Sequence, residues 1–351
     1  MNGFWKDKKV LITGGTGFLG KHLCDALLQK NALVTALDFH KAACVAAGLR
    51  FIEADIRRKE EVTDACAGRD VVFHLAAMPS IARGKAEEYY AVNVTGTRNI
   101  LDAAHRHGIK KFVYVSSSTP YGIPKEFPLK ETSQVNPIGK YGRSKLQAEE
   151  VCREFIAKGM NISIIRPRVI IGPGRIGIFS ILFERIRNNQ PVYVLGSGKN
   201  IFQFTHVSDM VDVCLKSAQY PGSDLFNAGC ADILPVREEL ELLIRHAKSR
   251  SRIISLPAGL ARAGLKLLSL AGVSPLVEEQ FAIADRNFKL DTAHAREVLG
   301  WSPRYSNRES LIQAYDWYAA HAPAGGAQYK NLFGVIGRFH HSMMGGFQVG
   351  N

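Results

Sequence analysis

The sequence predicts an α/β fold, with a doubly wound parallel sheet and a smaller second lobe. Three observations support this prediction. Short apolar runs alternate with helical patterns along the first half of the chain, which indicates parallel strands joined by crossover helices. The runs are almost continuously apolar, as expected for a sheet that helices cover on both faces. A glycine-rich stretch, TGGTGFLG at residues 13–20, follows the first run. These features together are typical of a Rossmann-type sheet.

The strand and helix candidates alternate in chain order. Each strand candidate is rich in Val, Ile, Leu or Phe, and each helix candidate places apolar residues on one face. The helix over residues 91–108 ends at Gly108 with His and Arg in its last turn, which suits the helix dipole. The predicted strands cover residues 10–13, 33–38, 50–55, 70–77, 111–118 and 162–167. The predicted helices cover residues 20–31, 60–68, 91–108 and 141–159.

The composition sets limits on the class of protein. The chain has 351 residues and a formal net charge of +13, and its six cysteines are scattered without a CxxC pair. We therefore expect no metal site and no disulfide framework, and a reducing compartment. We see no signal peptide and no apolar run of about 18 residues, so we expect a cytoplasmic protein. The basic charge fits a phosphorylated ligand, an anionic lipid or nucleic acid, or simply a solvated surface.

The glycines have the spacing of a dinucleotide-binding loop. Gly14, Gly17 and Gly20 stand between the first strand and its helix. Gly14 permits the tight turn, Gly17 lets the backbone approach a pyrophosphate, and Gly20 lets the helix pack on the strand. The amino end of the helix then presents free N–H groups to the phosphates.

Two carboxylates extend this interpretation. Asp38 ends the second strand, where it can accept hydrogen bonds from ribose hydroxyls and would repel a 2′-phosphate, so NAD is predicted rather than NADP. Asp55, at the end of the third strand, is a candidate partner of the adenine amino group, and an ordinary surface role is the alternative. We also assign flanking residues of these strand ends to the cofactor site, namely Phe18, Leu19, Ile56, Leu75, Ser116 and Pro167.

A candidate catalytic group follows the fifth strand. Tyr141 and Lys145 have an i, i+4 spacing on one helix face, and a serine run ends at Ser118. Oxidation of a carbinol needs a proton acceptor near its oxygen, and a phenol has an ordinary pKa of about 10. We expect Lys145 to lower the pKa of Tyr141 and to hold the nicotinamide ribose, and Ser118 to orient the reacting oxygen.

At this point the sequence resembles the extended short-chain dehydrogenase/reductase superfamily, specifically the NAD-dependent epimerase/dehydratase family. The matching stretches span residues 10 to about 315, and they are TGGTGFLG, HLAA, NVTGT, VSSS, YGRSK, GPG, HVSD, FNAG and LGWSP. The resemblance implies that Ala76 and Ala77 line the cofactor and that Asn93 holds the edge of the site. It also implies that the third serine is catalytic. The following Tyr121-Gly122 is one residue closer than usual, so Ser117 remains an alternative.

The resemblance also narrows the reaction. Dehydratases of this group have an Asp-Glu pair after the catalytic Ser or Thr, whereas Thr119 and Pro120 stand here. The stretch around residues 127–145 is similar to the sugar 4-epimerase branch, which works through a transient 4-keto intermediate. We therefore predict an NAD-dependent 4-epimerase of a nucleotide-diphosphate or undecaprenyl-diphosphate sugar. The alternatives are an NAD-dependent 3β-hydroxysteroid or long-chain hydroxy dehydrogenase and a non-enzymatic NAD(P)-sensing or RNA-binding protein.

The expected diphosphate clamp departs from the family pattern. UDP-sugar epimerases usually have an Arg at the position of Phe202. We expect Arg168, Arg175 or Arg286 to replace it, or the substrate to differ. The residues that we assign to the substrate are Met78, Ser80, Ser118, Arg168, Arg175, Gln203 and Arg286.

These assignments divide the chain into three parts. We expect an NAD-binding Rossmann domain over 1–167 with about 200–220, and a substrate-binding lobe over 168–199 and 221–320. The rest, 321–351, is expected to be a tail that is flexible or membrane-associated. The apolar stretch 256–273 is interpreted as a lobe helix or as an interfacial helix on the cytoplasmic face of the membrane. Family resemblance further implies a homodimer, and nucleic acid is not an expected partner.

Overall fold

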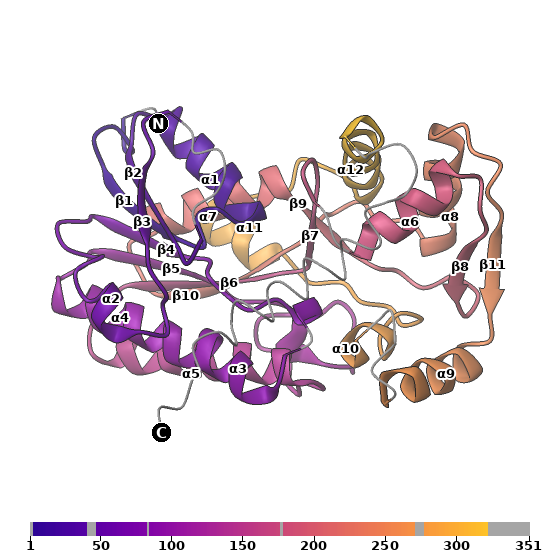
Figure 1. The fold of residues 1–351 in the computed structure, drawn as a ribbon, viewed down its shortest axis with the longest axis horizontal. Helices are drawn as coiled ribbons and strands as arrows, with labels where there is room; N and C mark the ends of the chain where they lie inside the picture. The colour runs from indigo at the N-terminus through magenta and orange to yellow at the C-terminus, as the bar shows by residue number, and fades with distance from the viewer. Residues whose placement is uncertain (1–2, 41–46, 83, 176–177, 271–276, 322–351) are drawn as a thin grey trace, which may run out of the picture.

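A seven-stranded parallel sheet organises the first part of the chain (Figure 1). The structure is a computed structural model that describes residues 3–40, 47–82, 84–175, 178–270 and 277–321. The strand order is β10-β6-β5-β4-β1-β2-β3, and every neighbouring pair is parallel. The strands are β1 (Lys9–Thr13), β2 (Leu33–Asp38), β3 (Arg50–Glu53), β4 (Val71–His74), β5 (Lys111–Val115), β6 (Ile162–Pro167) and β10 (Asp224–Ala228). The predicted Rossmann-type fold class is confirmed.

Helices cover both faces of this sheet (Figure 1). Along β1, Val10 and Ile12 face one apolar core and Leu11 faces another. All residues of β5 and β6 are buried for the same reason. One layer contains α1 (Phe18–Leu28), α7 (Val207–Gln219) and α11 (Ala293–Leu299). The other contains α2 (Lys59–Val62), α3 (Ala86–Tyr90), α4 (Gly96–Arg106) and α5 (Lys140–Ala157).

Two predicted helices differ from their expected bounds. The helix predicted over 60–68 ends at Val62, and the hydroxyl of Thr63 donates to the carbonyl of Lys59 at 2.7 Å, a local bond that competes with helix continuation. The helix predicted over 91–108 begins with a π-helical segment, Ala91–Thr95, before α4. Such wide turns often mark functional positions, and this one turns Asn93 into the interior.

The second lobe is built from short strands and helices around its own core. Phe183, Leu243 and Tyr318 belong to that core. β7 (Val169–Ile171) pairs with β9 (Phe204–His206), and β8 (Val192–Leu195) pairs with β11 (Ile253–Leu256). The helices are α6 (Ile178–Arg187), α8 (Val236–His246), α9 (Ala258–Leu270), α10 (Glu278–Phe281) and α12 (Asn307–His321).

The strand β10 departs from the predicted domain boundaries. Its residues were expected in the lobe, but it pairs with β6 along the sheet edge, with Asp224 opposite Ser163. The division into two domains otherwise stays a prediction. The predicted tail lies outside the described residues, apart from His321 at the end of α12. Within the described ranges, none of the helices combines the length and apolarity that crossing a bilayer requires.

Candidate active site

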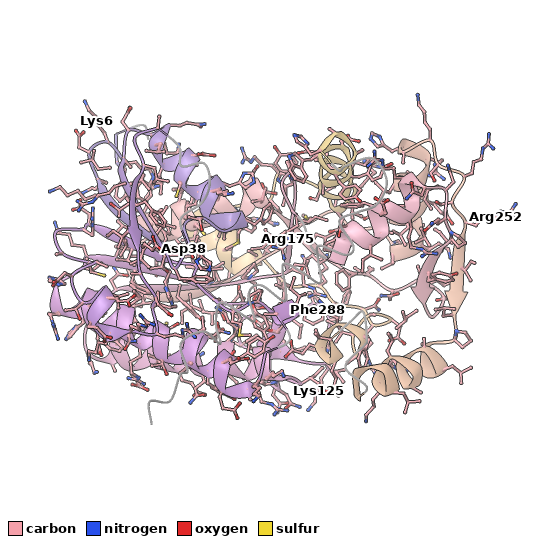
Figure 2. All side chains as sticks on the ribbon, in the orientation of Figure 1. Lys6, Asp38, Lys125, Arg175, Arg252 and Phe288 are labelled. Atoms are coloured by element: carbon pink, nitrogen blue, oxygen red, sulfur yellow. The ribbon has the colours of Figure 1, made fainter. Side chains whose placement is uncertain are left out.

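A cavity of about 850 Å³ opens where the carboxyl ends of the sheet strands meet the second lobe. Loops after β1, β2, β3, β4 and β5 line one side, and the segment after β6 lines the other together with residues of α6, β8, α8 and α10. Figure 2 shows Asp38 on the side of the sheet and Arg175 between the sheet and the lobe. This is the crevice in which open α/β sheets bind their ligands.

The glycine loop has the shape that a dinucleotide requires. Gly14 has φ +69°, and a Cβ there would lie 2.7 Å from the amide nitrogen of Ala76. A Cβ on Gly20 would overlap the carbonyl oxygen of Gly14. Gly17 is the N-cap of α1, and no side chain caps the helix there. The first turn of α1 therefore offers its N–H groups to a phosphate, so the residues present fit the pyrophosphate of NAD.

Asp38 and Asp55 both line the cavity, but they have different partners. Asp38 accepts hydrogen bonds from the Thr16 hydroxyl at 2.6 Å and the Thr16 amide at 3.2 Å, and its remaining lone pairs suit a ribose diol. Asp55 is held by Arg57, whose Nε lies 2.8 Å from its carboxylate. Burial pushes the pKa of Asp55 upward, but the bonds from Arg57 outweigh it and the pKa is lowered. The adenine role of Asp55 stays a prediction.

Tyr141 and Lys145 lie one turn apart on α5, and both line the cavity. The Lys145 amine donates to the carbonyl of Val115 at 2.8 Å, and burial lowers its pKa to about 7. Burial raises the pKa of the Tyr141 phenol to about 12, opposed by a hydrogen bond with Ser117 and by the charge of Arg175. Lys145 is not among the groups that shift the pKa of the phenol, and its predicted effect on Tyr141 stays a prediction. The Lys145 amine is turned to Val115, and Arg175 is the cation whose charge lowers the pKa of the phenol.

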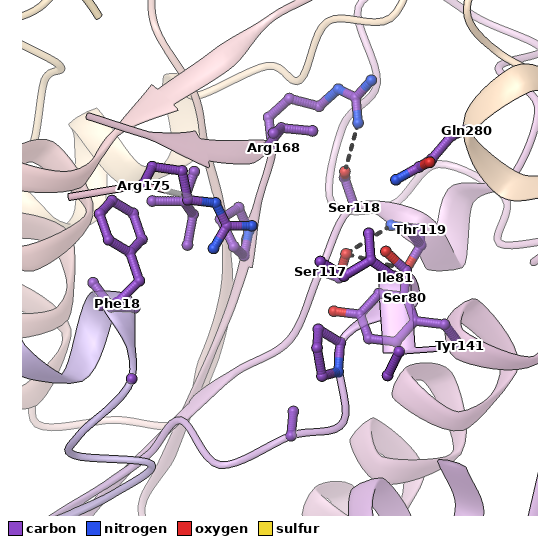
Figure 3. A pocket seen from close by; sticks show the side chains of 18 of the residues that line it. Phe18, Ser80, Ile81, Ser117, Ser118, Thr119, Tyr141, Arg168, Arg175 and Gln280 are labelled. Atoms are coloured by element: carbon purple, nitrogen blue, oxygen red, sulfur yellow. Dashed lines mark hydrogen bonds between the residues drawn. The ribbon is translucent and has the colours of Figure 1, made fainter. Parts of the chain in front are cut away.

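The three serines after β5 point to three different partners. Ser116 donates to Glu149 at 2.6 Å and so ties β5 to α5. Ser117 accepts hydrogen bonds from the amide and the hydroxyl of Thr119 at 3.2 and 3.1 Å, and it lowers the pKa of Tyr141. Ser118 accepts a bond from Arg168 at 3.4 Å. Figure 3 shows Ser118 turned toward Arg168, with Ser117 on the side of Tyr141. Ser117 is thus the serine that acts on the phenol in this structure, and the choice between Ser118 and Ser117 as the catalytic serine stays a prediction.

The two arginines of the predicted clamp also line the cavity. The Arg175 guanidinium lies 5.2 Å from the ring centre of Phe18, and burial lowers its pKa. Arg168 is buried deeper, with only 3% of its surface exposed. Its guanidinium carbon lies over the rings of Phe202 and Phe288, 4.2 and 3.9 Å from their centres.

Three predicted site residues lie away from the cavity lining. Asn93 accepts from the amide of Met78 at 2.7 Å and donates to Ser144 at 2.9 Å, so it fixes the β4 loop to α5. Gln203 is fully buried, and its side-chain amide is hydrogen-bonded to the backbone of Cys230 and Leu290. Arg286 is exposed on the surface. Gln203 and Arg286 therefore lie outside the lining of this cavity, and their predicted roles in substrate binding stay predictions.

The other predicted site residues line the cavity as expected of the sheet's carboxyl edge. They are Phe18, Leu19, Ile56, Leu75, Ala76, Ala77, Met78, Ser80, Ser116 and Pro167. Their individual roles stay predictions, because lining a cavity does not by itself show which ligand a residue contacts.

Glu279 is a site residue that the sequence did not indicate. It comes from α10 in the lobe, lines the cavity and accepts from the amide of Gly142 at 3.2 Å. Its carboxylate thus caps the amino end of α5, the helix that carries Tyr141. Burial raises the pKa of Glu279, and the charge of Glu279 in turn raises the pKa of Tyr141. No local signal marks such a residue, because 137 positions separate it from its partner.

Comparison with known proteins assigns the family. A model of the NAD dependent epimerase/dehydratase family matches residues 10–229. The uncharacterized protein y4nG of Sinorhizobium fredii is 36% identical over 328 residues, which cover 92% of this chain and 83% of that protein. The chain therefore belongs to the NAD dependent epimerase/dehydratase family. It is an NAD-dependent enzyme of the epimerase type, as the sequence predicted, and NAD is its cofactor.

Two further similarities point to different substrates. A 4-hydroxy-2-methyl-3-oxo-4-farnesyl-3,4-dihydroquinoline-1-oxide ketoreductase of Stigmatella aurantiaca is 27% identical, over 86% of this chain and 94% of that protein. The crystal structure of a UDP-glucose 4-epimerase from Thermotoga maritima with UDP-glucose has a TM-score of 0.75 at 25% identity. That match covers 90% of this chain and all of the other.

Proposed function

We propose that this chain is an NAD-dependent 4-epimerase of a sugar carried on a diphosphate. The observation that supports the proposal most is one cavity shared by the glycine loop, the Tyr141–Ser117 pair and two arginines of the lobe side. Thr119 and Pro120 follow the serines, so the acid and base that elimination needs are missing at those positions. Reversible oxidation at one carbon needs only the groups that are present.

Each group near the reacting carbon has a defined task. Tyr141 takes the proton of the sugar hydroxyl and returns it at the end of the cycle. Ser117 donates to the same oxygen and keeps it beside the phenol. Lys145 binds the ribose of the cofactor, and Glu279 holds the first turn of α5 in place. When bound, NAD supplies the reversible oxidation of the sugar carbon.

The lobe side of the cavity bears on the carrier of the sugar. Arg168 and Arg175 suit an anionic diphosphate. Beyond them the lining is apolar, and it includes Phe179, Leu182, Val194, Phe202, Leu240 and Ile283. Both a nucleotide and a polyprenyl chain fit the proposal, and the apolar lining favours the polyprenyl chain.

Helix α9 supports peripheral contact with a membrane. Its Arg262 is paired with Asp285 at 2.6 Å, whereas Leu260 and Leu267 are 75% and 69% exposed. An outward apolar face on a basic protein suits the surface of an anionic membrane. Sedimentation with anionic vesicles should be lost in the double variant Leu260→Gln, Leu267→Gln, and equal sedimentation of both proteins would refute the contact.

A second candidate is an NAD-dependent dehydrogenase of a sterol-like or long-chain hydroxy substrate. The apolar lining of the lobe side favours it, and so does the similarity to a ketoreductase whose named substrate bears a farnesyl group. The two candidates differ in their use of the cofactor. The dehydrogenase accumulates reduced cofactor in solution, whereas the epimerase leaves the absorbance of the nicotinamide unchanged after each turnover.

We further propose a homodimer through the outer faces of α4 and α5. These helices pack side by side and are joined by Arg98 and Glu154 at 2.8 Å. Light scattering during size-exclusion chromatography should give twice the mass of the chain, and a monomer at micromolar concentration would contradict this proposal.

Parallel assays with UDP-GlcNAc and with its undecaprenyl-diphosphate counterpart test the function and the carrier together. We expect a 4-epimer from at least one of them, with the purified protein's own cofactor. Tyr141→Phe should retain bound NAD and lose turnover. Full activity of that variant would show that the phenol does not transfer the proton.

A further inference from the structure

Arg168 is a buried cation that lacks a counter-ion within the described part of the chain. Its Nη1 donates to Ser118 at 3.4 Å, while Nε and Nη2 have no hydrogen-bond partner. Burial alone lowers the pKa of its guanidinium to about 9, and no carboxylate offsets this shift. A buried donor without an acceptor is costly, so a ligand atom is expected where these N–H groups point.

Arg166 provides an internal control two residues earlier. It is as deeply buried as Arg168, but its guanidinium forms two bonds to Glu149, at 2.9 and 2.6 Å, and only its Nη1 has no partner within the described residues. Along a regular strand, residues 166 and 168 would point to the same face, because successive side chains alternate between faces. Strand β6 ends at Pro167, so Arg168 does not continue this alternation. The fold thus supplies an acid for one arginine, while the other faces the cavity without one.

The surroundings of Arg168 fix its position without satisfying its charge. Its amide donates to the carbonyl of Ala228 at 2.9 Å, and its own carbonyl accepts from Thr205 at 3.3 Å. The guanidinium carbon lies over the rings of Phe202 and Phe288, which pack against it. Those contacts leave the edge of the guanidinium for hydrogen bonds, and that edge is the part that binds two oxygens of a carboxylate or phosphate.

We propose that Arg168 and Ser118 form an oxyanion subsite in the substrate half of the cavity, next to the reacting carbon. The subsite takes a carboxylate or a phosphate of the substrate. Ser118 is thereby a binding residue for the anion, and Ser117 remains beside Tyr141. The inference deepens the proposed function and rests on it for the identity of the cavity as the substrate site.

Two parts of a substrate could provide this oxyanion. One is the diphosphate that links the sugar to its carrier. The other is a carboxylate on the sugar ring, as in a uronic acid. UDP, UDP-glucose and UDP-glucuronic acid separate these sources, because only the last combines the diphosphate with a ring carboxylate.

The test begins with a measurement that needs no turnover. Thermal unfolding of the NAD-loaded protein is followed with millimolar inorganic phosphate or acetate, for the wild type, for Arg168→Met and for Arg252→Met. Arg252 is exposed at the outer edge of the lobe and serves as the matched control. We expect an anion-dependent rise of the midpoint in the wild type and the control, and a smaller rise in Arg168→Met. Equal rises in all three proteins would overturn the subsite.

Calorimetric titration then assigns the source. If the oxyanion is the diphosphate, Arg168→Met weakens UDP and both sugars alike, by roughly tenfold to a hundredfold. If it is a ring carboxylate, the variant weakens UDP-glucuronic acid alone by that factor. Unchanged affinity for all three ligands that the wild type binds, with NAD still bound, would also overturn the subsite. Failure to detect any epimer would refute the proposed function and leave these binding results standing.

Discussion

The two sides of the cavity differ in how the protein satisfies its own charges. On the sheet side, Asp38 is bonded to Thr16 and Asp55 to Arg57. Outside the cavity lining, Arg166 is paired with Glu149, although its Nη1 has no partner within the described residues. On the lobe side, Arg168 keeps two nitrogens without a partner, and one carboxylate oxygen of Glu279 has none within the described residues. The charged groups of the sheet side thus have partners within the protein. We propose that a substrate provides the missing partners on the lobe side.

The largest expected effect is a difference in unfolding free energy between variants of the two buried arginines. Arg166→Met leaves the carboxylate of Glu149 buried without its main partner, and such a loss costs about 3–5 kcal/mol of unfolding free energy. Arg168→Met removes a charge that has no partner, so it should leave stability unchanged or raise it. Urea unfolding of both variants measures the difference, and equal destabilisation would contradict the distinction between the two sides.

A second pair of variants separates the adjacent serines. Ser117→Ala removes the hydroxyl beside Tyr141 and should lower kcat about a hundredfold, as loss of one donor at a reacting oxygen does. Ser118→Ala should leave kcat nearly unchanged and raise KM, because its partner is Arg168. Steady-state kinetics decides this, and the reversed pattern would return the catalytic role to Ser118.

The part of the site that depends on local spacing could be predicted from the sequence. The glycines, Asp38 and the Tyr141–Lys145 pair each belong to one loop, strand end or helix turn, so the chemistry of neighbouring residues determines their placement. The bounds of β2 and β6 were predicted to the residue for the same reason. The fold class could also be predicted, because strands that are buried on both faces are apolar along almost their whole length.

The remaining features depend on contacts that the sequence does not display. Tyr121-Gly122 follows the serine run one residue closer than usual, so the sequence could not distinguish Ser117 from Ser118. Gln203 was assigned to the substrate although its amide satisfies the backbone of Cys230 and Leu290. Glu279 reaches the first turn of α5 from a distant helix. Each of these outcomes is set by tertiary packing.

The burial of Lys145 should make the stability of the protein depend on pH. Burial lowers its pKa to about 7 in the folded protein, whereas an unfolded lysine has a pKa of about 10.4. Between these values the unfolded state binds more protons, so the stability of the wild type rises with pH across this window. Lys145→Met lacks this pH-dependent contribution to the free energy of unfolding. As pH increases, the wild type should therefore gain stability relative to the variant. Parallel unfolding curves for both proteins at pH of about 7 and about 9 would contradict the lowered pKa.

The smallest expected effect concerns Arg175. Burial raises the pKa of Tyr141, and the charge of Arg175 is among the influences that lower it. Arg175→Gln should therefore move the acid limb of the pH profile of kcat to higher pH, by a fraction of a unit at least. The same substitution at Arg252 is the control, and an unmoved profile would show that this cation does not act on the phenol.

The fate of the hydrogen on C4 of the sugar tests the central claim most directly. In the proposed reaction, the same hydrogen leaves the sugar carbon and returns to it within one cavity. A diphosphate sugar that the enzyme accepts, with deuterium at C4, should yield the 4-epimer with the deuterium still at C4, as mass spectrometry would show. An epimer that has exchanged this deuterium with solvent, or a keto product with reduced cofactor in solution, would contradict the account.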